Sequence, residues 1–502
     1  MPTPPPLPPA KPSRTKTLLV SLLALASLAA AGITIWRTMS SFEPEEDVPA
    51  EEAASAEAPI PIPLREIDVD RLVGQYLDKQ DYFRGIEAAT LAEYDRANAP
   101  DKPWHAEGRQ AARLFAVFAV WNDFYGQGIL QTCDAFAAAA YKKGCRDPLI
   151  ASICDIRIFN GRHSNDNAGA QDHIRRTRKL NASNYPPLFK LIATRTLLRN
   201  LIYTKNHPED LRDDLSPSWA EIPSFVPEVG AQFSAFLKEN PPTELLFFRT
   251  RQLFDDVEDG ECLVPIEHEI ESAFSRENPT HPVRAALRGV FLTAWAWQAR
   301  GGGWANTVTQ EGWRLMADRL EQANRVLTDA CEKNPDDYLA ATVMLSVELG
   351  QGTGRSTMEE WFRRAMNGHP DNYAACSSKL RYLQPRWYGS PQDVVKFGQQ
   401  CVETDNWRAN LPLILPNGIS DLANYQEDLY LNDVVWNLVS PVYEEYLKRY
   451  PDSIGVRTEY ANCAALGNRL DVLRKQLDAL GDNWDRSVWS DRNYRRISAL
   501  VK

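Results

Sequence analysis

Residues 334–341 read Asn-Pro-Asp-Asp-Tyr-Leu-Ala-Ala, and residues 369–376 read His-Pro-Asp-Asn-Tyr-Ala-Ala-Cys, at an offset of 35 residues. A third Pro-Asp pair stands at Pro451 and Asp452. Flanking positions agree in residue type at the same offset: Leu327 aligns with Phe362, Ala330 with Ala365 and Leu345 with Leu380. A helix that ends at a Pro-Asp turn and leads into a second helix rich in small residues cannot bury its apolar face alone. The repeat therefore predicts stacked helix pairs.

Apolar residues elsewhere recur at steps of three and four, which place them on one face of a helix. The clearest series is Trp313, Met316, Leu320, Ala323, Leu327 and Ala330, and an earlier one is Ala111, Leu114, Phe118 and Trp121. The sequence has no sustained alternation of β-branched residues, which a sheet would require. We therefore predict an all-α fold in which short, turn-rich connections join antiparallel helices.

Two resemblances follow from these stretches. The repeated units are similar to tetratricopeptide repeats, whose period is about 34 residues. This similarity covers about residues 313–480 and implies a right-handed α-solenoid of helical hairpins. Residues 299–305, 358–366, 379–380 and 385–390 resemble an exported bacterial family of helical-repeat proteins known only as a domain of unknown function. That resemblance implies a bacterial envelope protein and carries no activity with it.

The N-terminal region predicts a membrane anchor. Residues 1–16 form a Pro-rich basic tail, and residues 17–36 form an uncharged apolar run that is about 30 Å long as a helix. Basic residues precede the run and mainly acidic ones follow it, so we expect a cytoplasmic N-terminus and an exported C-terminal part. The alternative is a cleaved signal peptide, since Ala29 and Ala31 before Gly32 form a suitable cleavage site.

Composition divides the rest of the chain. Residues 37–63 are acidic and rich in proline and alanine, which predicts an extended tether. We expect an N-terminal helical region at 64–206, a Pro-rich connection at 207–227 and a C-terminal repeat region at 228–502. The net charge of −11 argues against nucleic-acid binding. Eight cysteines in an exported chain permit disulfides without specifying their pairing, and buried thiols are the simpler interpretation.

Two sequence features are candidates for partner binding. Arg386, Trp387 and Tyr388 combine a cation with aromatic rings, which suits a peptide carboxylate or a sugar face. The structural alternative is a corner between helices, with Trp387 filling a groove and Ser390 capping the next helix. The second feature is the basic run of Arg175, Arg176, Arg178 and Lys179. It is either a solvated helix face or a docking site for an acidic partner.

No motif for a cofactor, a metal or a catalytic nucleophile is present in the sequence. These features favour a non-enzymatic scaffold or adaptor of the cell envelope that binds a protein or peptide, with its oligomeric state left open. The alternative is an envelope enzyme or ligand-binding protein with a site in the helical cup, for example one that acts on cell-wall glycan. The stretch Glu271-Ser272-Ala273-Phe274 resembles the start of the lytic transglycosylase motif, but the Gly-Leu-Met-Gln segment that follows in that family is missing here.

Overall fold

The computed structural model describes residues 64, 67–70, 79–121, 129–159, 166–257, 261–303, 305–426 and 428–501. Within these ranges the regular structure is helical and contains no strand, which confirms the predicted all-α class. The predicted tail, membrane anchor and tether at residues 1–63 lie outside the described part of the chain. None of the described helices combines the length and apolar character needed to cross a bilayer.

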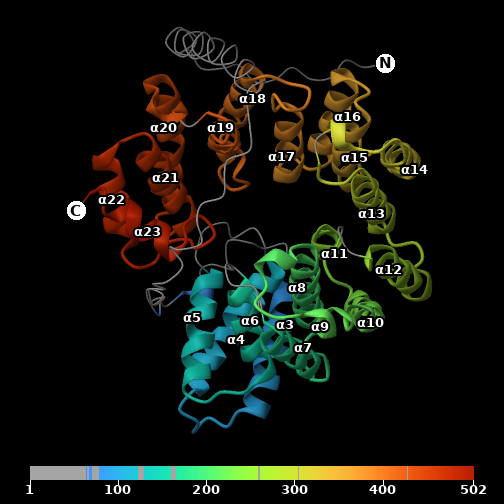
Figure 1. The fold of residues 1–502 in the computed structure, drawn as a ribbon, viewed down its shortest axis with the longest axis vertical. Helices are drawn as coiled ribbons and strands as arrows, with labels where there is room; N and C mark the ends of the chain where they lie inside the picture. The colour runs from blue at the N-terminus through green and yellow to red at the C-terminus, as the bar shows by residue number, and fades with distance from the viewer. Residues whose placement is uncertain are drawn as a thin grey trace.

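Most helices form two layers, shown in Figure 1, in which each inner helix packs against the next inner one. The inner helices are α4 (His105–Val120), α6 (Pro148–Phe159), α8 (Pro187–Asn206), α11 (Thr243–Val257), α13 (Val283–Arg300), α15 (Tyr338–Gln351), α17 (Tyr373–Tyr382) and α19 (Ile414–Ala423). The outer helices are α3 (Gln80–Ala97), α5 (Ile129–Lys142), α7 (Asn167–Asn181), α10 (Phe225–Lys238), α12 (Leu263–Glu277), α14 (Gln310–Lys333), α16 (Arg355–Gly368) and α18 (Pro391–Glu403). Because each outer helix packs on an inner one, the buried core runs along the whole arc.

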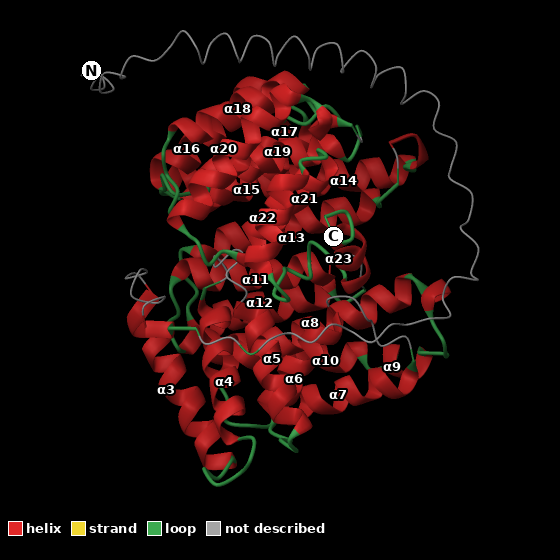
Figure 2. Cartoon of the chain, turned by 90° about the vertical axis from the view of Figure 1, so that its left-hand side faces the viewer, coloured by secondary structure: helices red, strands yellow, loops and turns green. Residues whose placement is uncertain are grey.

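Four helices complete the C-terminal end: α20 (Asp433–Arg449), α21 (Ile454–Leu466), α22 (Leu470–Leu480) and α23 (Asp491–Ser498). They have a small core of their own, in which the rings of Trp484 and Tyr494 stack with centroids 3.7 Å apart. The amide of Gln131 on α5 donates to Asp485 at 3.1 Å, so the last helices return to the first ones. Figure 1 shows this closed course, and Figure 2 shows α3–α12 below α13–α22 in the side view.

The two copies of the repeat begin their second helices in the same way. The side chain of Asp337 accepts a hydrogen bond from the amide of Ala340 at 2.9 Å, and Asn372 accepts one from Ala375 at 2.9 Å. These N-caps precede α15 and α17, whose first residues are 35 positions apart as predicted. The third copy differs, because Ser453 precedes α21 without a side-chain capping bond.

The helix α14 confirms most of its predicted buried face. Met316, Leu320, Ala323 and Leu327 are buried, Ala330 is partly buried, and Trp313 at the start of the same face is 41% exposed. Trp313 lies under the guanidinium of Arg300 instead, 5.3 Å from ring centroid to cation. The apolar face begins one turn later than the spacing predicted.

The connection predicted at 207–227 contains short helical turns. It includes η3 (Pro208–Asp210), α9 (Ser216–Trp219) and η4 (Ile222–Ser224), and α10 already begins at Phe225. Three other single turns lie between longer helices: η5 (Ala305–Thr307), η6 (Leu411–Leu413) and η7 (Leu429–Leu431).

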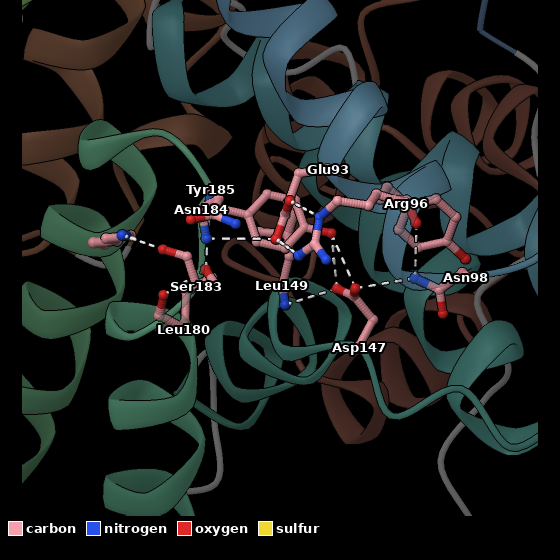
Figure 3. A network of polar contacts seen from close by, with 11 residues as sticks. Glu93, Arg96, Asn98, Asp147, Leu149, Leu180, Ser183, Asn184 and Tyr185 are labelled. Atoms are coloured by element: carbon pink, nitrogen blue, oxygen red, sulfur yellow. Dashed lines mark hydrogen bonds and ion pairs between the residues drawn. The ribbon is translucent and has the colours of Figure 1, made fainter.

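A buried carboxylate joins the starts and ends of three helices. Asp147 accepts hydrogen bonds from the amides of Leu149 and Ile150 at the start of α6, at 2.9 and 3.3 Å. The hydroxyl of Tyr185 and the amide of Asn98 donate to it at 3.0 Å, as Figure 3 shows. Burial raises the pKa of Asp147, and the bonds from Asn98 and Tyr185 oppose that rise. The network fixes α8, which carries two arginines of the site described below.

Arg249 ties α11 to the end of α4. This arginine is 1% exposed and donates to the carbonyl oxygens of Phe118 and Ala119, at 2.5 and 2.8 Å from Nη2. Those carbonyls belong to the last turn of α4, where the helix dipole favours a cation. The contact fixes the position of α11 relative to the N-terminal helices.

The cysteines are free thiols, as in the simpler of the two interpretations given for the sequence. All eight are described, none forms a disulfide, and seven are buried while Cys154 is partly exposed. Burial raises the pKa of Cys262, Cys331 and Cys463 to about 11, so these thiols stay protonated at neutral pH.

Candidate functional site

A cavity of ≈ 120 Å³ opens on the inner layer between α11, α13, α15 and α17. Five apolar residues of its lining come from α13 and α15, namely Val290, Ala294, Trp297, Val343 and Leu349. Thr293 and Ser346 add hydroxyl groups, and Arg251, Asp255 and Arg381 add charge. We call this site the inner cavity. It combines one aromatic ring and aliphatic side chains with charged groups from two other helices.

The helix α11 supplies a positively charged and a negatively charged side chain one turn apart. Arg251 and Asp255 stand at i and i+4, with 3.6 Å between Nε and Oδ2. The side chain of Asp255 is 53% exposed, yet burial raises its pKa and Arg251 opposes that rise. Both observations fit a carboxylate on a concave wall, whose oxygens reach solvent while protein surrounds them on other sides.

More arginines lie behind this pair on α8. Arg195 and Arg199 both contact the carboxylate of Asp256, at 3.1 and 3.7 Å. Burial raises the pKa of Asp256, and the two arginines hold it down. The Arg195 side chain is 11% exposed and also donates to Gln252. One aspartate is therefore shared between two cations next to the inner cavity.

The helix α17 brings Arg381 to the opposite side of the cavity. Arg381 is exposed, and its guanidinium lies 6.0 Å from the ring centre of Trp387. The Trp387 ring in turn meets Trp297 edge-on, with centroids 5.7 Å apart. Trp297 lines the cavity directly. The predicted residue Trp387 thus supports the cavity from behind.

The two residues beside Trp387 point into other contacts. Arg386 donates to the hydroxyl of Tyr425 at 2.9 Å, and the hydroxyl of Tyr388 donates to the carbonyl of Leu349 at 3.2 Å. The amide of Asp393 donates to Ser390 at 3.2 Å, which confirms that Ser390 caps α18. The corner geometry predicted for residues 385–390 is therefore present, with Tyr388 47% exposed at its edge.

The predicted basic run on α7 is neutralised within the fold at three of its four positions. Arg176 donates to Asp155 at 2.9 Å from Nε, Arg175 pairs with Asp172, and Arg178 pairs with Glu221 at 2.8 Å. Lys179 is exposed. The basic run and the inner cavity are built from separate elements, α7 in one case and α11, α13, α15 and α17 in the other.

Charge distinguishes the inner cavity from the molecule as a whole. The chain carries a net charge of −11, but its described residues place more arginines than aspartates around this site. Farther along, burial raises the pKa of Asp421, and Arg386 and Arg381 oppose that rise. Among the lining residues two arginines stand beside one aspartate: Arg251 and Arg381 beside Asp255. An anionic ligand matches this excess.

Metal and acid–base chemistry have less support in the geometry. Among the residues that the structure describes, no group of three or more histidine, cysteine or carboxylate side chains is arranged to hold a metal ion. Glu271, at the stretch similar to lytic transglycosylases, accepts from Arg284 at 3.0 and 2.8 Å. Within the cavity, Asp255 is the one carboxylate among the lining residues.

Comparison of the chain with models of known families, with curated proteins and with solved structures gives no match. The function proposed below therefore depends on the chemistry of the cavity.

Sequence reasoning missed Arg251, Asp255, Trp297 and Arg381. The i,i+4 spacing of Arg251 and Asp255 was visible, but such pairs are common on helix surfaces. Residues 297 and 381 lie within or beside the stretches that carry the second resemblance, and their contact through Trp387 places those stretches together. No local signal connects them to α11.

Proposed function

We propose that this protein is a membrane-tethered, exported α-solenoid that binds a protein partner through the inner face of its helical arc. The two layers and the repeated N-caps support a solenoid of tetratricopeptide-like hairpins. The uncharged run at 17–36 and its flanking charges support an anchor with the N-terminus in the cytoplasm. In this arrangement the acidic tether holds the helical part away from the membrane.

The inner cavity is the observation that carries the proposal. Four consecutive inner helices line it, so it belongs to the face along which solenoids bind extended partners. Its lining includes side chains that dominate binding sites, namely Trp297, Arg251 and Arg381. An enzyme that works by acid–base catalysis requires two converging proton donors or acceptors. The cavity contains one carboxylate, that of Asp255, and its arginines stay protonated and cannot accept a proton. Binding is therefore better supported than acid–base catalysis.

In-cell photocrosslinking tests this proposal. A photoreactive amino acid is placed at Ser346, which lines the cavity, and in a matched variant at Arg314, which is 58% exposed on α14. We expect the Ser346 variant of the full chain to form a defined crosslink to a protein and the Arg314 variant to lack that band. Crosslinks of equal yield at both positions, or none at Ser346, would contradict binding through the inner face.

A further inference from the structure

Two of the eight cysteines meet at their thiols. Cys376 lies in the first turn of α17 and Cys401 in the last turn of α18, 25 positions apart in the sequence. Their thiols share a hydrogen bond, which raises the pKa of Cys401 together with burial. The sulfur atoms of a disulfide are about 2.05 Å apart, so two thiols in direct contact are close to the distance at which they bond.

The packing of α17 against α18 places these two positions opposite each other. Lys379 follows Cys376 by one turn of α17. Its Nζ lies 4.7 Å from the ring centre of Phe397, which precedes Cys401 by one turn of α18. A step forward on one helix therefore corresponds to a step backward on the other, as in an antiparallel pair. The cation and the ring thus indicate the same register as the two thiols.

A second contact shows that the two helices stay adjacent toward the connection at 383–390. A Cβ at Gly418 on α19 would meet side chains of both helices, with Val394 Cγ1 at 2.7 Å and Leu380 Cδ1 at 2.9 Å. Leu380 of α17 and Val394 of α18 therefore lie side by side against the same point of α19. The cysteine pair belongs to a packed helical hairpin.

Cys133 and Cys154 are the next candidates for a pair. The influence of Cys154 on Cys133 is electrostatic and adds to the burial that raises the pKa of Cys133. The Cys133 thiol donates to the carbonyl oxygen of Ala111 at 3.2 Å. Cys376 and Cys401 are joined by a hydrogen bond instead, so the structure favours their pairing.

Burial sets the stage at which this pair can be oxidised. Cys376 and Cys401 are 2% and 3% exposed, so a soluble oxidant does not reach them in the closed fold. Oxidation therefore takes place while α17 and α18 are still open, either during folding or in a local opening of the hairpin. The charge of Lys379 opposes the rise in the pKa of Cys401 and so favours the thiolate, which is the reactive form.

We propose that Cys376 and Cys401 form a disulfide bond that joins α17 to α18 when the chain meets a disulfide-bearing oxidant outside the cytoplasm. The thiolate of one cysteine attacks a sulfur of the oxidant, forms a mixed disulfide and releases one oxidant thiolate. The other cysteine loses its proton and attacks the protein sulfur of the mixed disulfide, which releases the second oxidant thiolate. The two cysteines lose two protons and two electrons, and the oxidant disulfide becomes two thiols.

The proposal rests on the proposed function for the location of the chain alone. The exported compartment supplies oxidants of this class, whereas the cytoplasm keeps thiols reduced. The choice of Cys376 and Cys401 as partners depends on the fold and is tested with purified protein. Location and pairing are therefore tested separately.

The first experiment maps the bond in the detergent-solubilised full chain, refolded from urea in oxidised and reduced glutathione. Free thiols are alkylated with iodoacetamide, and digestion with trypsin under non-reducing conditions is followed by mass spectrometry. Trypsin releases Cys376 in the peptide 365–379 and Cys401 in the peptide 397–408. We expect these two peptides, joined and lighter by two hydrogen atoms, as the main linked species.

Variants and thermal melting then relate the bond to the fold. Cys376→Ser and Cys401→Ser are each expected to abolish the linked species, whereas Cys331→Ser, at a buried cysteine of α14, is expected to keep it. The oxidised protein should melt about 5 °C above the reduced protein, because the closed loop constrains the unfolded chain. For Cys376→Ser the two melting temperatures should agree. Because the peptide map uses the unmodified protein, the proposal stays testable if a variant fails to fold.

Three results would overturn the proposal. The first is the absence of the linked peptides after oxidation, and the second is a link between Cys133 and Cys154 at equal or higher yield. The third is a lower melting temperature of the oxidised protein, which would show that the bond strains the fold.

Trapping of thiols with acid in cells that express the full chain tests the location. A bond found in these cells would support both the pairing and the export. A bond that forms in the purified protein while the cysteines stay reduced in cells would contradict the exported location in the proposed function and leave the pairing supported.

Discussion

Replacing Asp147 with alanine removes an acceptor on which four donors of a buried network converge (Figure 3). The change takes the N-cap from α6, which costs about 1 kcal/mol. It also leaves the hydroxyl of Tyr185, in a residue 2% exposed, without this acceptor, at about 1–3 kcal/mol. Removing a buried carboxylate offsets part of that loss, since burial raises the pKa of Asp147. We expect a net loss of about 2–4 kcal/mol in the free energy of unfolding.

Urea denaturation of the full chain, followed by circular dichroism at the helix band and by tryptophan fluorescence, measures this loss. The matched control is Asp166→Ala, which removes the N-cap of α7 and its one bond to the amide of Gly169 at 2.7 Å. That control is expected to lose about 1 kcal/mol. Asp147→Asn keeps the shape of the side chain and one acceptor oxygen. Its loss of stability is expected to lie between those of Asp147→Ala and Asp166→Ala. A loss for Asp147→Ala no greater than that for Asp166→Ala would refute the argument that the network is jointly stabilising.

Two further predictions concern packing and pH. A Cβ at Gly289 on α13 would lie 2.5 Å from Leu327 Cδ2, so Gly289→Ala should cost about 1–3 kcal/mol in urea denaturation. The control is Gly85→Ala, because no heavy atom lies within 4 Å of a Cβ at Gly85. This variant should gain about 0.5–1 kcal/mol in the free energy of unfolding. Similar losses for both variants would contradict the close approach of α13 to α14. Burial and Asp485 raise the pKa of Glu459 from 4.5 to about 7. Between pH 4.5 and about 7 the folded state therefore keeps a proton on Glu459 that the unfolded state has lost, so the stability of the fold falls as pH rises through this range. At pH 8, Glu459→Gln should be more stable than the unmodified protein by at most about 3 kcal/mol, and near pH 5 the two should be equally stable. Equal stability at both pH values would argue against a buried acid at this position.

The repeat and the helix boundaries could be predicted because their causes are local. The 35-residue offset reappears in the start positions of α15 and α17, and in the caps formed by Asp337 and Asn372. An N-cap requires only a side chain and an amide three residues later, so the sequence contains both partners. Trp313 shows the limit of such reasoning: helical spacing placed it on the same face as Met316 and Leu320, yet it is 41% exposed, because spacing does not reveal how far neighbouring helices cover that face.

The candidate site was predicted less well. Residues 385–390 form the expected corner, and Trp387 contacts the wall of the inner cavity through Trp297. The basic run on α7 is balanced by Asp155 and Glu221, which stand far from it in sequence. A run of basic residues in the sequence does not show which acidic residues, distant in sequence, will lie beside it in the fold. The net charge of that surface therefore cannot be predicted from the run alone.

The sequence by itself determined that this chain forms helices, where several of them begin, and that a 35-residue unit recurs among them. Those features depend on side-chain spacing and on hydrogen bonds between near neighbours. Only the tertiary structure decided that Arg251 of α11 and Arg381 of α17 face the same cavity as Trp297. These residues lie as much as 130 positions apart in the sequence. Their meeting depends on how each helix packs against the next, because small rotations between successive helices add up along the arc.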